Sequence, residues 1–303
     1  MPISHHPSFN RPKASTPLWR YTDLSKFVDL ITSRQLWLTN AEILSSDDPY
    51  EGWPGPIRFP HRLWKKLEDV PEPLRRQIID IYGRGEGNTE DSAFASWVML
   101  EEQSCMYTQF GRRNYYMNCW HAALHESIAM WKIYASPGAG VAIVSNGARL
   151  ESALAMTSQV LNLGAVRYED PNVLQIGASN SFDTLMVKRV SYSYEQEVRL
   201  VYWDTEDMHN PLPEFSWNKE TMRFDNIVED NRPINPGVSL KCDIDTLIER
   251  VLISPFAPSW YREMIDRLKS NSGLSFLFFL QSTCNSTIGS LGYYFVQKFV
   301  RSR

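Results

Sequence analysis

The sequence lacks several features that would assign it to a familiar class of protein. Its most apolar run, LSFLFFLQ at 274–281, is too short to span a bilayer, so no membrane contact is expected. The 4 cysteines form no CxxC pair, which argues against a zinc knuckle or a dense disulfide framework. The opening residues contain no apolar targeting segment, and we expect a cytoplasmic protein with reduced thiols.

A strong excess of one charge is also missing. The formal net charge is -4, which argues against duplex nucleic acid as a partner held by overall charge. Neither a GxGxxG nor a GxxxxGK[ST] loop is present, so the two common nucleotide-binding folds have no support from their own motifs. What the chain does have is 303 residues, of which 43% are hydrophobic and 13% aromatic, enough for a large core.

The order of the predicted elements indicates an α+β fold. Residues 1–17 are polar and rich in proline and predict a flexible N-terminal arm. Residues 18–303 predict a single α+β domain with an insertion near 204–240. Predicted strands and helices do not alternate regularly, which favours a bent or split, mostly antiparallel sheet flanked by helices over a doubly wound sheet.

Individual segments carry recognisable local signals. Asp23 is placed to cap a helix that follows the strand LWRY at 18–21. The segment 115–154 reads as strand, loop, helix, turn, strand and helix. Further strands are expected at QLWLT, AVRYE, EVRLVYW, RVLISP and SFLFFLQS (275–282), and a helix at 258–270.

The segment YSYEQEVRLVY at 192–202 places charged and apolar residues at alternate positions. In a strand, Glu195, Glu197 and Arg199 share one face, while Val198 and Leu200 share the other. The charged row is either the solvated face of a sheet or the floor of an active site. Solvated strand faces with cross-strand ion pairs are common, so the sequence leaves both interpretations open.

Two other polar groups suggest metal sites at first sight. His121 and His125 are four apart, but HAALHE is not HExxH and offers no third ligand, so no bound metal is expected. The loop SSDDPYEGWPGP at 45–56 supplies Asp47, Asp48 and Glu51. These carboxylates can bind a cation, although aspartates that cap local backbone groups in a turn are the more common case.

Several blocks of the sequence resemble a known family. They are LWRYTDLSKFVDLI, SSDDPYEG, NCWHAALHESIAMWKIYASPGAGVAIVSN and VKRVSYSYEQEVRLVYW, in this order over 18–255. Together they resemble the bacterial domain-of-unknown-function family numbered 2971. The resemblance covers most of the chain, but it implies no established chemistry.

A more distant likeness is to arginine-type ADP-ribosyltransferases, which implies an ADP-ribosyltransferase-like fold and NAD as substrate. Arg20 matches the first-strand arginine that clamps the pyrophosphate, and Ser145 matches the middle-strand serine. Glu195 and Glu197 match the E-x-E pair, in which one carboxylate engages the nucleophile and the other stabilises an oxocarbenium-like cation. The middle strand reads AIVSN rather than S-T-S, a departure from the pattern.

The same likeness implies an NAD-binding set that also includes Tyr21, Trp131, Tyr134 and Arg199. Trp131 and Tyr134 share a helical face with Ile128 if this segment is a helix, so that one ring can stack on nicotinamide or adenine. The common alternative for these aromatic residues is a place in the core. For Ser145 it is a helix N-cap, and for Arg20 it is a surface ion pair.

Three functions are therefore expected in order of preference. The first is an NAD-using ADP-ribosyltransferase-like enzyme, a bacterial toxin or phage-defence effector with an unidentified macromolecular or small-molecule acceptor. The second is a non-catalytic module that senses a nucleotide or a partner. The third is a metal-dependent nuclease, which would need clustered carboxylates from the 45–56 loop and the E-x-E strand.

Overall fold

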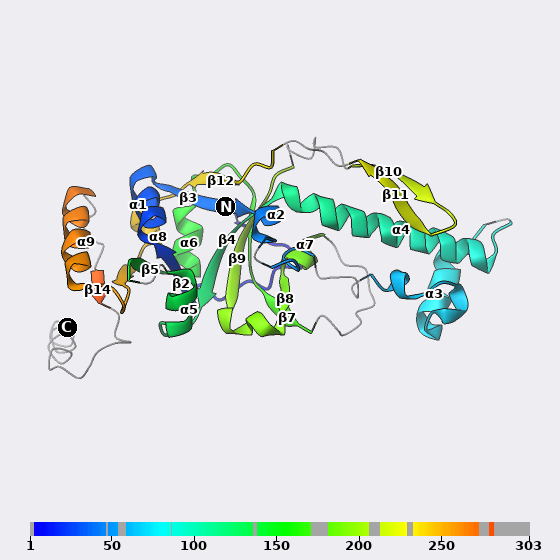
Figure 1. Ribbon diagram of the computed structural model, residues 1–303, viewed down its shortest axis with the longest axis horizontal. Coiled ribbons are helices and arrows are strands. Elements are labelled where there is room, and N and C mark those ends of the chain that lie inside the picture. Colours follow the sequence, from blue (N-terminus) through cyan, green and yellow to red (C-terminus); the bar gives the residue numbers. More distant parts are fainter. Residues whose placement is uncertain are drawn as a thin grey trace. The chain divides into compact units, whose positions relative to one another are not determined.

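A computed structural model describes most of the chain (Figure 1). The described residues are 3–46, 48–53, 59–85, 87–135, 138–170, 181–205, 213–228, 233–272 and 279–281. Asp47, Cys284, 206–212 and 229–232 of the expected insertion, and most of the strand expected at 275–282 lie outside them. The chain divides into two compact units, each assembled from three separate segments. The sequence had predicted one domain for 18–303.

The first unit contains Met1–Pro12, Leu36–Trp120 and Met156–Leu240. Its main strands are β1 (Ile3–Ser4), β3 (Gln35–Asn40), β4 (Tyr115–Ala122), β6 (Leu161–Ala165), β9 (Glu197–Trp203) and β12 (Gly237–Lys241). Hydrogen bonding follows the order β1-β6-β9-β4, and β3 pairs with both β4 and β12. The β6–β9 and β3–β4 pairs are antiparallel, whereas β1–β6 is parallel.

Shorter elements of the first unit connect these strands. They are α2 (Ala41–Leu44), η2 (Pro60–Leu63), η3 (Leu67–Asp69), η4 (Arg112–Asn114), β7 (Arg167–Glu169), α7 (Ser181–Leu185), β8 (Val187–Arg189) and η5 (Val190–Glu195). β7 pairs with β8 in parallel. The expected strand AVRYE is thus two strands, because the chain leaves β6 at Ala165 before β7 begins.

A long helix, a shorter helix and a β-hairpin pack together in the first unit. The helix α4 (Glu90–Gly111) begins with a capping box, in which Thr89 and Ser92 satisfy each other's backbone N–H groups. Packed against it are α3 (Glu72–Tyr82) and the hairpin β10 (Glu214–Asn218) and β11 (Arg223–Val228), as Figure 1 shows. Trp217 and Met222 of the hairpin region join the apolar cluster around Trp97. The hairpin falls in the expected insertion.

The second unit contains Lys13–Gln35, His121–Ala155 and Lys241–Arg303. Its elements are β2 (Pro17–Asp23), α1 (Leu24–Ser33), α5 (Ile128–Tyr134), β5 (Gly140–Asn146), α6 (Gly147–Ala153), α8 (Ile244–Leu247), β13 (Arg250–Ile253), α9 (Ser259–Ser272) and β14 (Phe279–Gln281). β2–β5 and β5–β13 are antiparallel, whereas β13–β14 is parallel. Helices α1, α5 and α6 contact these strands.

The α+β class is therefore confirmed, with an open, mixed sheet flanked by helices. Most of the strand pairs in the described part of the sheet are antiparallel, as the sequence predicted, whereas β1–β6 and β13–β14 are parallel. The expected elements between 115 and 154 are all present. Among the described helices, none has the length and apolar character needed to cross a membrane.

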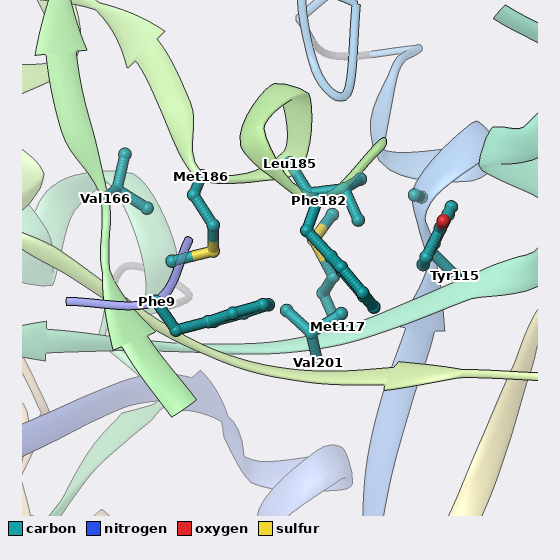
Figure 2. Close-up of a cluster of buried hydrophobic side chains, with 9 residues drawn as sticks. Phe9, Tyr115, Met117, Val166, Phe182, Leu185, Met186 and Val201 are labelled. Atoms are coloured by element: carbon teal, nitrogen blue, oxygen red, sulfur yellow. The ribbon is translucent and has the colours of Figure 1, made fainter. Parts of the chain in front are cut away.

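The N-terminal residues are not the loose arm that the sequence predicted. Ile3 and Ser4 pair with Leu161 and Asn162. Phe9 is buried in a cluster of the first unit together with Met117, Phe182 and Val201 (Figure 2). Two apolar side chains in an otherwise polar segment are enough to anchor it, which composition averaged over 17 residues does not show.

Candidate functional site

The charged face of β9 is buried. β9 is an inner strand with β6 on one side and β4 on the other, and Glu197 and Arg199 point to the same face. Only 5% of Glu197 and 0% of Arg199 are exposed. Side chains from the 48–53 loop and from β8 pair with them and cover this face. The interpretation of the charged row as a solvated strand face is therefore wrong.

Glu195 reaches the same place from a different element. It ends the 3-10 helix η5, and the left-handed backbone of Gln196, with φ 41, turns the chain into β9. The expectation that all three charged residues share one strand face is therefore wrong for Glu195. Its carboxylate is nevertheless buried next to Glu197, because one lysine binds both.

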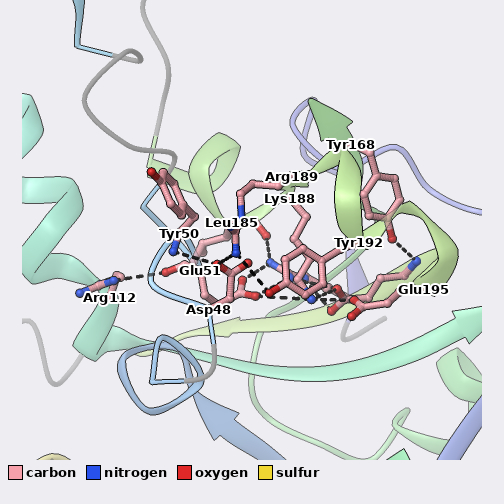
Figure 3. A network of polar contacts seen from close by, with 12 residues as sticks. Asp48, Tyr50, Glu51, Arg112, Tyr168, Leu185, Lys188, Arg189, Tyr192 and Glu195 are labelled. Atoms are coloured by element: carbon pink, nitrogen blue, oxygen red, sulfur yellow. Dashed lines mark hydrogen bonds and ion pairs between the residues drawn. The ribbon is translucent and has the colours of Figure 1, made fainter. Parts of the chain in front are cut away.

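Arg199 is the centre of the site by its contacts, and Figure 3 shows Glu51, Leu185, Lys188 and Glu195 of the same network. Its Nε donates to Glu197 Oε1 at 2.8 Å and its Nη2 to Glu197 Oε2 at 3.0 Å, a bidentate arrangement. Nη2 also donates to Glu51 Oε2 at 2.9 Å, and Nη1 donates to the Leu185 carbonyl. The guanidinium thus ties β9 to the loop of Glu51 and to the end of α7.

Lys188 is the second cation of the site. Its Nζ lies 2.6 Å from Glu195 Oε2, 3.1 Å from Glu197 Oε2 and 3.8 Å from Glu51 Oε2. We refer to Glu51, Lys188, Glu195, Glu197 and Arg199 as the buried ion cluster. It holds three carboxylates against two cations, so full ionisation leaves one excess negative charge away from bulk water.

The environment shifts the pKa values of two of these carboxyls in opposite directions. Burial, opposed by Arg199, raises the pKa of Glu51 above its ordinary value. Burial also acts on Glu197, but Arg199 and Lys188 outweigh it and lower the pKa of that carboxyl well below its usual range. The same carboxylates raise the pKa of Lys188 against the effect of burial. The site thus favours the ionised form of Glu197 and disfavours that of Glu51.

Two further side chains position Glu197. The backbone N–H of Glu197 donates to Tyr168 Oη at 2.7 Å, and burial raises the pKa of Tyr168 to about 12. The Cys119 thiol on β4 forms a hydrogen bond with the Glu197 side chain, and burial raises the pKa of this thiol well above its ordinary value. Both groups stay protonated near neutral pH.

An aspartate and an arginine lie beside the buried ion cluster. Asp48 Oδ1 accepts from the Tyr50 N–H at 3.1 Å and from Arg189 Nη2 at 2.9 Å. The Arg189 guanidinium carbon lies 4.9 Å from the Tyr50 ring centroid and 5.2 Å from that of Tyr192. Local backbone capping is thus confirmed for Asp48, whereas Glu51 belongs to the buried ion cluster.

The other residues of the expected NAD site lie in the second unit. Ser145 is fully buried on β5, and its Oγ donates to the Leu247 carbonyl at 2.6 Å. The N-cap of α6 is Asn146, so the alternative interpretation of Ser145 as a cap is wrong. The β2–β5 register places Arg20 on the same face as Ser145.

The aromatic residues of the second unit are mainly core residues. Tyr21 Oη accepts from the Ser127 N–H at 2.8 Å, and its ring meets Trp131 edge to face at 5.0 Å. Trp131 is fully buried, while Tyr134 is 43% exposed and Ile128 37%. The helix expected for this segment is α5, on which these three residues follow one another at i, i+3 and i+6, and Trp131 is the buried member between two partly exposed neighbours.

The two histidines do not share a helix. His121 is a buried residue at the end of β4, and His125 is an exposed residue that lies before α5. Among the described residues, no group of three or more His, Cys, Asp and Glu side chains is arranged to hold a metal ion.

Comparisons of the chain with protein-family models, with curated proteins and with solved structures found no match. Sequence reasoning singled out Glu195, Glu197 and Arg199, but not Lys188 or Arg189. The signal was present in the sequence, since VKR lies just upstream of YSYEQEVR, but alternation within one strand cannot find residues of another element.

Proposed function

We propose that the chain is an enzyme that cleaves the bond between nicotinamide and ribose in NAD and transfers the ADP-ribosyl group to water or to another acceptor. The buried ion cluster is its reaction centre. The observation that carries this proposal is that Glu51 and Glu197 bind one guanidinium, while their environments shift their pKa values in opposite directions. Paired carboxylates of this kind are typical of acid–base and glycosyl-transfer chemistry.

The roles of Glu197 and Glu51 in this reaction follow from their opposite pKa shifts. As the bond to C1′ of the ribose breaks, its electron pair leaves with nicotinamide and an oxocarbenium-like cation develops. Glu197, whose low pKa keeps it ionised, stabilises that cation. The nucleophile then bonds to C1′ and gives its proton to Glu51. A raised pKa makes Glu51 a better base than an ordinary carboxylate.

The two cations hold the carboxylates in place. Arg199 fixes the plane of Glu197 by bidentate pairing, and Lys188 keeps Glu195 and Glu197 together despite their like charge. Glu195 engages the acceptor, as the likeness to ADP-ribosyltransferases implies. Ser145 has no role in this proposal, because its hydroxyl already donates to a backbone carbonyl.

One observation favours the second candidate, a non-catalytic module that binds a nucleotide or partner. All three carboxylates are already paired with Arg199 or Lys188, and a satisfied network of this kind can also serve only to hold loops together. The two candidates differ in one measurable property, which is whether bond cleavage depends on Glu197.

The test is nicotinamide release from NAD by the parent protein, Glu197→Gln and Glu51→Gln. We expect both substitutions to lower kcat on the order of a hundredfold while the Kd for NAD changes little. The matched control is Glu102→Gln, which also removes a buried paired carboxylate, bound by His61 and Arg62, outside the buried ion cluster. No nicotinamide release by the parent, or equal rates in parent and Glu197→Gln, would overturn the proposal.

A further inference from the structure

Asp48 and Arg189 leave one acceptor and one donor unused. Asp48 is 4% exposed; its Oδ1 is occupied by the Tyr50 N–H and Arg189 Nη2, but no group in the described part of the chain donates to its Oδ2. Arg189 Nε likewise finds no acceptor there. Buried polar atoms are nearly always paired, so two neighbouring exceptions indicate a place where a ligand supplies the missing partners.

The ring contacts of Arg189 explain why these two atoms do not pair with each other. The guanidinium lies against the rings of Tyr50 and Tyr192, and its Nη2 is shared between Asp48 Oδ1 and Tyr192 Oη, 3.2 Å away. This orientation uses one edge of the guanidinium and leaves Nε unused. The Arg189 side chain is 32% exposed, so the pair reaches the surface of the first unit.

The pair also adjoins the proposed reaction centre. Arg189 follows Lys188 on β8, and Lys188 Nζ lies 4.9 Å from the centroid of the same Tyr192 ring that Arg189 contacts. Figure 3 shows Asp48, Arg189 and Tyr192 beside Lys188 and Glu195. A ligand group bound here would therefore be next to a bond cleaved at the buried ion cluster.

We propose that Asp48 and Arg189 recognise a carboxamide, the substituent of the nicotinamide ring. Asp48 Oδ2 accepts the amide N–H, and Arg189 Nε donates to the amide carbonyl. Tyr50 and Tyr192 hold the Arg189 guanidinium in place for this contact. This inference rests on the proposed function, and it adds a specificity: a carboxylate in place of the carboxamide has no N–H to donate to Asp48 Oδ2 and brings a second carboxylate against Asp48.

The test compares the Kd values of NAD and of its nicotinic acid analogue, measured before turnover consumes the ligand. We expect the parent protein to bind NAD at least about tenfold more tightly, because the analogue leaves a buried polar group unpaired and brings two like charges together. Asp48→Asn keeps the size of the side chain but offers an N–H in place of Oδ2. It should reverse the preference, so that the analogue binds more tightly than NAD.

Two further variants keep the result interpretable. Asp69→Asn is the matched control, because Asp69 also caps a backbone N–H, that of Lys65, in an exposed turn; it should leave the ratio unchanged. Arg189→Lys retains the charge but loses Nε, and should weaken NAD binding even if Asp48→Asn fails to fold.

If NAD and the analogue bind the parent with equal Kd values and neither variant changes the ratio of these values, the inference is overturned, while Glu197-dependent nicotinamide release still supports the proposed function. If neither dinucleotide binds or is cleaved, both fail.

Discussion

Arg199 donates through Nη2 to Glu51 Oε2 at 2.9 Å, although 148 positions separate the two residues in the sequence. This contact joins the inner strand β9 to the turn after α2, and Glu197 binds the other edge of the same guanidinium. Tertiary contacts thus complete the site. Glu51 and Glu197 share one guanidinium, but their environments shift their pKa values in opposite directions.

The first prediction is that removing the charge of Glu197 and of Glu51 has different effects on stability. Glu197→Gln leaves Arg199 and Lys188 partly unpaired in a buried site, so at pH 7 it should lower the free energy of unfolding by about 3 kcal/mol. Glu51→Gln removes the excess carboxylate, whose charged form burial disfavours, and should change that energy by less than about 1 kcal/mol. Urea unfolding of both variants measures the difference.

The contributions of Glu197 and Glu51 to stability also change with pH in opposite directions. The lowered pKa of Glu197 contributes stability above the ordinary carboxyl range, and this contribution is lost as pH falls. The raised pKa of Glu51 contributes stability below that range, and this contribution is lost as pH rises through its folded value. The free energy of unfolding of Glu51→Gln, taken relative to that of the parent, should therefore be higher at pH 8 than at acidic pH. If Glu51→Gln lowered the free energy of unfolding at pH 8 as much as Glu197→Gln does, the opposite pKa shifts of the two carboxyls would be contradicted.

A second prediction concerns the acid stability of the α4 region. Glu102 is bound by His61 at 2.6 Å and by Arg62 at 2.7 Å, and although burial acts to raise its pKa, these partners lower it from 4.5 to about 2. The stability it contributes is present above pH 4.5 and is lost as pH falls toward 2. The difference in unfolding free energy between the parent and Glu102→Gln should shrink over that interval.

The control for this prediction is Glu68→Gln, which changes an exposed carboxylate of the same unit. Its unfolding free energy should stay within about 0.5 kcal/mol of the parent at every pH. A difference for Glu102→Gln that does not change between pH 5 and pH 2.5 would show that the ion pairs of Glu102 do not persist in solution.

Local sequence signals predicted the elements better than they predicted the site. Asp23 caps α1 as expected, with its side chain accepting from the Lys26 N–H, because the capping residue and the helix are adjacent in the chain. The burial of Glu197 and Arg199 was not predictable in the same way. Alternation within a strand identifies residues that share a face, but not what covers that face, and here the cover comes from Glu51 and Lys188.

A third prediction tests the packing of the N-terminal residues. Phe9 is 6% exposed and packs against Phe182, with ring centroids 5.4 Å apart. Phe9→Ala should therefore lower the free energy of unfolding by about 3 kcal/mol. The exposed residue His5 is the control, and His5→Ala should have almost no effect. Equal unfolding midpoints for the two variants would mean that the segment is loosely attached, as its composition had suggested.

A fourth prediction separates structural from catalytic roles at Ser145. Its Oγ donates to the Leu247 carbonyl at 2.6 Å in a fully buried position, which links β5 to the end of α8. Ser145→Ala leaves that carbonyl without its side-chain donor and should lower the free energy of unfolding by about 1 kcal/mol. Nicotinamide release should stay within about twofold of the parent, because the hydroxyl has no role in the proposed chemistry.

Ser270 provides a matched control for this substitution, since its Oγ also donates to a backbone carbonyl, that of Asp266, at 3.0 Å, but from an exposed helix surface. Ser270→Ala should be neutral in both assays, because water replaces an exposed hydrogen bond. A loss of nicotinamide release in Ser145→Ala of the size expected for Glu197→Gln, with the unfolding midpoint unchanged, would have the opposite meaning. Ser145 would then act in the reaction, as the likeness to ADP-ribosyltransferases implies, and its bond to Leu247 would have to break before NAD is cleaved.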